Sequence, residues 1–337
     1  MTSQRFPSIM LHNVGETASA DWADGQRLYR VPISIRSELN DGARERMGHA
    51  TGCEVRFCPR SLDSEVAVTL SAPEPTQVRV FWGSFQPTET DTIDSTPTTL
   101  TLSVPERLRD LKEGIATGRF DRTVCRILFD RSVPVALHDV VGDCRPPKAE
   151  ELPDRRYLAY GTSITEGAKA SSPHLNYVSQ LARKRGYDAL NLGASGSAYL
   201  DAAMADHIAD RDDWDIATLA LSVNMTTGEF STQEFHQRAE YFVNTIADAH
   251  PQKQIVCVTL FPYFADITDT GDTDLANAFR AALRTVVSDS SQNNLSLVEG
   301  TDLLTGTGLT CDLLHPSDVG MNSITNGLST HFAKALD

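Results

Sequence analysis

The sequence contains no apolar run of about 18 residues, the length that a helix needs to cross the hydrocarbon core of a bilayer. We therefore expect no membrane-spanning helix. The first residues, Met1 to Pro7, are polar and lack the apolar stretch of a secretory leader. These two absences together predict a cytoplasmic protein.

Cysteine is scarce and scattered, with 6 cysteines in 337 residues and no C-x-x-C pair. Cys53 and Cys58 are the one close pair, and their spacing with a nearby histidine indicates a zinc site only weakly. We therefore expect reduced thiols, several of them buried as small apolar side chains. No metal and no cofactor are predicted.

Positive charge is also in short supply. Lys and Arg total 30 against 45 Asp and Glu, a net charge of −15 at pH 7. Such a surface repels nucleic acid and anionic membranes, so neither is an expected partner. Lysine accounts for only 6 of the 30 basic residues. Adaptation to a salt-accumulating cell and a GC-rich genome both explain this bias, and the sequence does not separate them.

The rest of the composition, 40% hydrophobic and 22% charged, is that of a globular protein, and 337 residues are enough for two domains. Residues 1–144 contain short runs in which apolar and polar residues alternate, with prolines between the runs. This pattern predicts an antiparallel β-sandwich. The expected strands are 28–35, 54–57, 65–70, 77–82, 98–104 and 123–129.

A proline-rich, charged linker is predicted at 145–153. From residue 154 onward, strands alternate with helices, which is typical of an α/β domain with a doubly wound parallel sheet covered on both faces. The expected strands are 156–160, 188–192, 216–221, 255–260 and 295–298. The expected helices are 177–185, 232–249, 275–287 and 316–336.

Functional sites in such a sheet lie beyond the carboxyl ends of the strands. Ser163 follows the first predicted strand, Gly196 the second and Asn224 the third. Asp312 and His315 stand just before the last helix. Each has an ordinary structural interpretation alone, such as a helix cap, a tight turn or a loop hydrogen bond. Together they supply every group that acyl transfer requires.

The chemistry assigns a role to each residue. A serine hydroxyl is a poor nucleophile until a base takes its proton, so Ser163 needs His315. Asp312 can fix the tautomer and the orientation of that imidazole. The oxyanion of the tetrahedral intermediate needs preorganised donors. The backbone N–H groups of Ser163 and Gly196 and the side-chain amide of Asn224 provide them.

The order of these residues resembles the SGNH hydrolase family, also called the GDSL esterase/lipase family. The matching blocks are residues 161–163, 191–196, 222–225 and 312–315. The resemblance implies a three-layer, flavodoxin-like catalytic domain over 154–337, with Ser163, Asp312 and His315 as the triad. It also implies a jelly-roll-like accessory domain over 1–144.

This sequence departs from the family pattern at two blocks. Thr162 stands where the family has aspartate, but that position is outside the triad. Ser222 and Met225 stand where the third block has glycine and aspartate, so this block matches least well. A rival nucleophile, Ser195, lacks the second glycine of the G-x-S-x-G elbow of α/β-hydrolases.

The predicted activity is that of a serine esterase on a small or carbohydrate-borne acyl ester, of acetyl type, acting through an acyl-enzyme. An acyltransferase would use the same triad with an alcohol in place of water, and a non-catalytic binding protein on the same fold is a third alternative. The acyl chain, the alcohol, the role of the accessory domain and the oligomeric state are left open.

Overall fold

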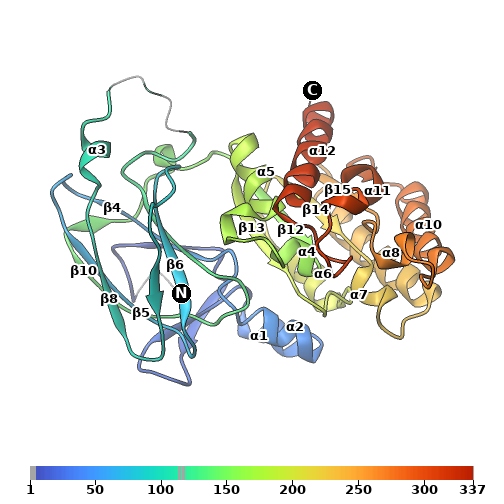
Figure 1. Cartoon of the computed structure of the whole chain (residues 1–337), viewed down its shortest axis with the longest axis horizontal. Coiled ribbons are helices and arrows are strands. Elements are labelled where there is room, and N and C mark those ends of the chain that lie inside the picture. The colour runs from blue at the N-terminus through green and yellow to red at the C-terminus, as the bar shows by residue number, and fades with distance from the viewer. Residues whose placement is uncertain (1–4, 113–114, 116–117, 337) are drawn as a thin grey trace. The chain divides into compact units, whose positions relative to one another are not determined.

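The computed structural model describes residues 5–112, 115 and 118–336 (Figure 1). The chain divides into two compact units. The first comprises residues 1–33 and 47–154, and the second comprises residues 34–46 and 155–337. None of the helices in the described ranges combines the length and the apolar character that crossing a membrane requires.

The first unit consists of two antiparallel sheets, as the alternating runs predict. One sheet has the order β1 (Met10–His12), β4 (Glu54–Pro59), β9 (Cys125–Phe129), β6 (Thr76–Trp82) and β7 (Asp91–Ile93), and β11 (Cys144–Arg145) also pairs with β4. The other has the order β2 (Glu16–Ser19), β3 (Gln26–Tyr29), β10 (Ala136–Gly142), β5 (Val66–Ser71) and β8 (Thr98–Leu102). A short helix, α3 (Glu106–Arg109), follows β8.

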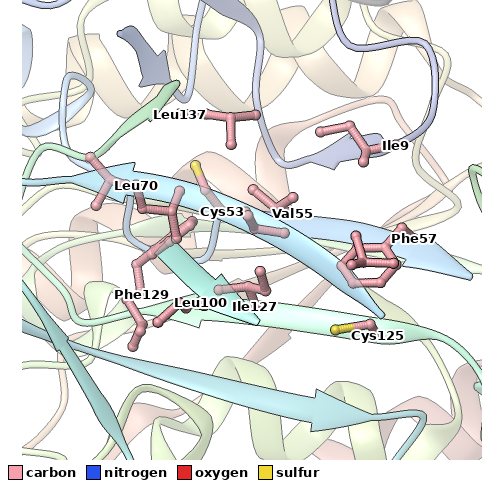
Figure 2. Packing of buried hydrophobic residues seen from close by; sticks show 14 of the residues in the cluster. Ile9, Cys53, Val55, Phe57, Leu70, Leu100, Cys125, Ile127, Phe129 and Leu137 are labelled. Carbon is pink, nitrogen blue, oxygen red and sulfur yellow. The ribbon is translucent and has the colours of Figure 1, made fainter. Parts of the chain in front are cut away.

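Alternation along the strands builds the core of this unit. In β5, Val66, Val68 and Leu70 are fully buried, while the residues between them are half-exposed. Figure 2 shows Leu70 and Leu100 among the clustered side chains from the two sheets. Burial of one face of each sheet against the other is the packing that defines a sandwich.

The structure corrects the predicted strand 28–35. Strand β3 ends at Tyr29, and helix α1 (Ile33–Glu38) begins at Ile33, followed by α2 (Asp41–Arg46). The Ile-Ser-Ile alternation suited a strand, but three residues are too few to separate a strand from a helix. Contacts group residues 34–46 with the second unit, whereas the sequence assigned them to the sandwich.

The second unit contains one parallel sheet with the order β13 (Asp188–Gly193), β12 (Arg156–Gly161), β14 (Ile216–Ala220), β15 (Gln254–Val258) and β16 (Leu295–Val298). Its main helices are α5 (Tyr177–Arg185), α6 (Ala202–Ala209), α8 (Thr232–Ala249), α10 (Thr273–Asp289) and α12 (Asp318–Leu336). The predicted doubly wound α/β class is therefore confirmed.

Residues on the two faces of β12 pack against opposite helix layers. Tyr157 lies edge-on to Phe332 of α12, with ring centroids 5.7 Å apart. Tyr160, on the other face, stacks on Phe242 of α8 at 4.6 Å. With helices on both sides, β15 is buried on both faces, which explains its continuous apolar run. Beyond the carboxyl ends of β12, β13 and β14 lie the candidate site residues.

Candidate active site

Ser163 is placed by a tight strand-to-helix turn. It is the first residue of α4 (Ser163–Glu166), and Thr162 caps that helix by accepting a hydrogen bond from the N–H of Ile164. A Cβ on Gly161 would lie 2.3 Å from the Thr165 hydroxyl oxygen, so this turn requires glycine. The turn presents the Ser163 side chain at the carboxyl edge of the sheet.

The hydroxyl of Ser163 meets the imidazole of His315, which comes from the loop before α12. The distance from Ser163 Oγ to His315 Nε2 is 2.9 Å. On the other side of the ring, His315 Nδ1 lies 2.8 Å from Asp312 Oδ2. With Nδ1–H donating to the carboxylate, the neutral ring presents Nε2 as the acceptor for the serine hydroxyl. The three side chains thus form a continuous hydrogen-bonded chain across 152 residues of sequence.

Asp312 is held by its own loop. Its Oδ1 accepts hydrogen bonds from the backbone N–H of Leu314 (3.0 Å) and of His315 (2.9 Å), and from the Thr310 hydroxyl (2.8 Å). Partial burial alone would raise the pKa of Asp312, but the donors from His315, Leu314 and Thr310 outweigh it and hold this pKa well below its usual value. The carboxylate therefore stays charged while it orients His315.

Gly196 and Asn224 lie in the segments that follow the two strands next to β12. In the parallel register, Gly161 pairs with Gly193 on one side and with Ala220 on the other, so the three strand ends are adjacent. Gly196 adopts φ +68°, and a Cβ there would meet no atom within 4 Å. Among the described residues, the Gly196 N–H donates to no backbone carbonyl.

Asn224 belongs to α7 (Val223–Thr226), directly after β14. Its Oδ1 accepts a hydrogen bond from the N–H of Ala198 at 3.2 Å. This bond fixes the orientation of the amide and leaves the Nδ2 hydrogens to donate elsewhere. It also ties the third block to the loop that carries Gly196.

The sequence assigned no role to Glu166, yet this buried carboxylate connects two of the loops. Its Oε2 accepts a hydrogen bond from the Ser195 N–H at 2.9 Å and another from the Ser195 hydroxyl. The rival serine therefore donates to a carboxylate, whereas Ser163 contacts the histidine. The signal for Glu166 was an acidic residue in the short segment that follows a buried strand, five residues after the end of β12.

Ser222 explains why glycine is usual at the start of the third block. Its φ is +110° with ψ −51°, a conformation that strains any residue with a Cβ. Within the described chain, its buried hydroxyl also has no hydrogen-bond partner. This serine therefore stores strain beside the site.

We expect Ser222→Gly to raise the free energy of unfolding by about 1 kcal/mol, because relief of strain exceeds the added flexibility of the unfolded chain. Denaturant titration measures the change. Ser231→Gly is the matched control, since Ser231 has φ −73° and caps α8 through its side chain, so it should destabilise. A lower free energy of unfolding for Ser222→Gly would show that the backbone at Ser222 is not strained.

The described residues contain no group of three or more His, Cys, Asp or Glu side chains that could hold a metal ion. All six cysteines are free, five of them buried and Cys311 exposed.

Comparisons with known proteins place the second unit in a sequence family. A family model described as GDSL-like Lipase/Acylhydrolase matches residues 154–332. A search of curated proteins finds no match to the sequence.

Solved structures share the whole two-unit fold at low identity. Salicylyl-acyltransferase SsfX3 from a tetracycline biosynthetic pathway has a TM-score of 0.78 at 17% identity, covering 97% of this chain and 95% of that one. A putative GDSL-like lipase from Bacteroides ovatus has a TM-score of 0.70 at 19% identity, covering 98% and 96%. A family two carbohydrate esterase from Clostridium thermocellum, in complex with cellohexaose, has 0.64 at 15%, covering 97% and 99%.

Proposed function

Since the chain belongs to the GDSL-like lipase/acylhydrolase family, we propose that it is a serine esterase that cleaves a small acyl ester, of acetyl type, carried on an alcohol or a carbohydrate. The observation that carries this proposal is the hydrogen-bonded chain from Ser163 through His315 to Asp312. Such a chain activates a hydroxyl for attack on a carbonyl carbon.

Acylation begins when Ser163 Oγ attacks the ester carbonyl and His315 Nε2 takes its proton. Asp312 stabilises the imidazolium through Nδ1. The carbonyl oxygen becomes an oxyanion, which accepts hydrogen bonds from the N–H groups of Ser163 and Gly196 and from the amide of Asn224. When the tetrahedral intermediate collapses, the C–O bond to the alcohol breaks and His315 gives its proton to the leaving oxygen.

Deacylation repeats these steps with water as the nucleophile. His315 takes a proton from water, and Ser163 leaves with that proton restored to Oγ. An alcohol in place of water would make the protein an acyltransferase. This second candidate is favoured by the likeness to a salicylyl-acyltransferase over 97% of the chain.

A similar fold in a carbohydrate esterase is the reason that we include carbohydrate esters among the proposed substrates. The Clostridium thermocellum esterase, whose structure contains cellohexaose, has both units of this fold. An acetylated oligosaccharide is therefore the first natural substrate class to test.

An acyl-chain series of esters tests the size of the acyl group, and added sugar alcohols distinguish an esterase from an acyltransferase. We expect p-nitrophenyl acetate to be hydrolysed with a kcat/KM at least about tenfold above that of the octanoate, because a site built for a small acyl group excludes a long chain. Added sugar alcohols should leave the release of free acid dominant if the protein is an esterase. Acylated sugar as the main product would favour the acyltransferase.

The binding-protein alternative makes a different prediction for the same protein. A fluorophosphonate probe should label Ser163 of the esterase and should leave a non-catalytic protein unlabelled. Peptide mass spectrometry locates the label.

A further inference from the structure

Part of the segment between β3 and β4 belongs to the second unit, although both strands belong to the first. Residues 34–46, which hold most of α1 and all of α2, group with residues 155–337. Leu39 and Ala43 are buried, at 2% and 4% exposure, so the segment is packed into the structure. The hydrogen bonds of one of its residues, Asn40, reach the loop that follows β13.

Asn40, between α1 and α2, makes the principal contacts. Its Nδ2 donates a hydrogen bond to the backbone carbonyl of Ser197 at 3.0 Å and another to Asp201 Oδ2 at 2.6 Å. Its Oδ1 accepts a hydrogen bond from the N–H of Ala43 at 3.1 Å, which caps α2. One amide thus serves two functions, with its oxygen directed to its own helix and its nitrogen to the loop.

Gly42 brings the same segment into close contact with the loop. A Cβ on Gly42 would lie 2.7 Å from the Cβ of Ser197. Real Cβ atoms do not approach that closely, so this packing needs glycine. Two positions of one segment therefore contact Ser197, Asn40 through a hydrogen bond and Gly42 through close packing.

Ser197 is the residue directly after Gly196, and Ser195, directly before it, is held by Glu166. The residues on the two sides of Gly196 are therefore each held by a hydrogen bond, Ser195 from its N–H to Glu166 of α4 and Ser197 at its carbonyl by Asn40 of the 34–46 segment. We propose that Asn40 is a positioning residue that holds the Gly196 N–H in place for the oxyanion. This inference rests on the proposed function, since it assigns Asn40 to the same site.

The sharpest test is Asn40→Asp in the full chain. Aspartate keeps an oxygen for the Ala43 N–H, so the helix cap is retained. It removes the donor to Ser197 and sets a carboxylate against Asp201. We expect kcat for p-nitrophenyl acetate to fall about tenfold or more with KM nearly unchanged, because an oxyanion donor acts in the transition state.

Two further variants separate positioning from general stability. Asn40→Asp combined with Asp201→Asn reverses the donor and the acceptor, and should recover part of the lost kcat. Ser37→Ala is the control, because Ser37 is exposed on α1 and its hydroxyl donates a hydrogen bond to the Ser34 carbonyl of the same helix. Its kcat and its melting temperature should both match the wild type.

Gly42→Ala tests the same loop by steric displacement. Alanine is the better helix former, so a fall in kcat without a fall in melting temperature would come from displacement of Ser197. If Asn40→Asp fails to fold, this variant decides. A kcat within about twofold of wild type in the folded variants would overturn the role of Asn40. A wild-type protein that neither hydrolyses esters nor reacts with the fluorophosphonate would instead overturn the proposed function.

Discussion

Ser163→Ala should lower the turnover of p-nitrophenyl acetate by about a thousandfold or more while the melting temperature stays close to that of the wild type. Without the hydroxyl no acyl-enzyme forms, and the remaining amide donors give only weak catalysis by water. Stopped assays of acid release measure the loss. Fluorophosphonate labelling of the variant should be absent.

Ser195→Ala is the matched comparison, because it removes the hydroxyl of the rival serine in the loop that carries Gly196. The Ser195 N–H still donates to Glu166 after this change, so we expect this variant to lose far less activity than Ser163→Ala. Equal losses from the two substitutions would contradict the assignment of Ser163 as the nucleophile. A fully active Ser163→Ala protein would do so directly.

Glu54→Gln should lower the free energy of unfolding by about 3–5 kcal/mol, the range for breaking a buried ion pair from one side. Glu54 is 6% exposed. Its carboxylate accepts hydrogen bonds from Arg56 Nε at 2.7 Å and from Arg126 Nε at 2.8 Å. The neutral amide would leave the guanidinium groups of Arg56 and Arg126 without the negative charge of Glu54 that pairs with both of them. Both guanidinium groups also lie close to the Phe120 ring. Urea titration of the full chain measures the change.

The pH dependence of this effect has a defined sign. Burial alone would raise the pKa of Glu54, but Arg126 and Arg56 outweigh it and hold that pKa well below its usual 4.5. Its stabilising contribution is therefore complete above about pH 4.5 and declines as the pH falls further. The difference in the free energy of unfolding between wild type and Glu54→Gln should therefore become smaller as the pH falls below about 4.5.

Glu74→Gln is the control, because Glu74 lies on an exposed turn. It should change the free energy of unfolding by less than about 0.5 kcal/mol.

Much of the second unit could be predicted from sequence because its signals are local. The helices 177–185 and 232–249 occur with the predicted bounds, since each begins at a capping residue and carries an apolar stripe. Asp312 and His315 lie three residues apart, so their contact needs only one loop. Placing Ser163 beside them needed the rule that parallel strand ends share an edge.

The features that sequence missed depend on distant contacts or on backbone strain. Asn40 and Ser197 are 157 residues apart, and nothing near Asn40 indicates its partner. Strand β10 was not predicted, because its register shifts between Leu137 and Asp139 and breaks the alternation. Ser222 was noted as a departure from glycine, but its positive φ became visible only in the structure.

The grouping of residues 34–46 with 155–337 has a consequence for biosynthesis and for engineering. On the ribosome, the 34–46 segment with α1 and α2 emerges long before the loop at 197–201. It therefore cannot form its contacts with Ser197 and Asp201 until more than a hundred further residues have been synthesised. A fragment cut at residue 155 would lack Asn40 and Gly42 and would leave the Ser197 carbonyl without its donor. Residues 155–337 expressed alone would therefore lack part of their own compact unit. A design that transfers this unit to another protein would need to include the 34–46 segment as well.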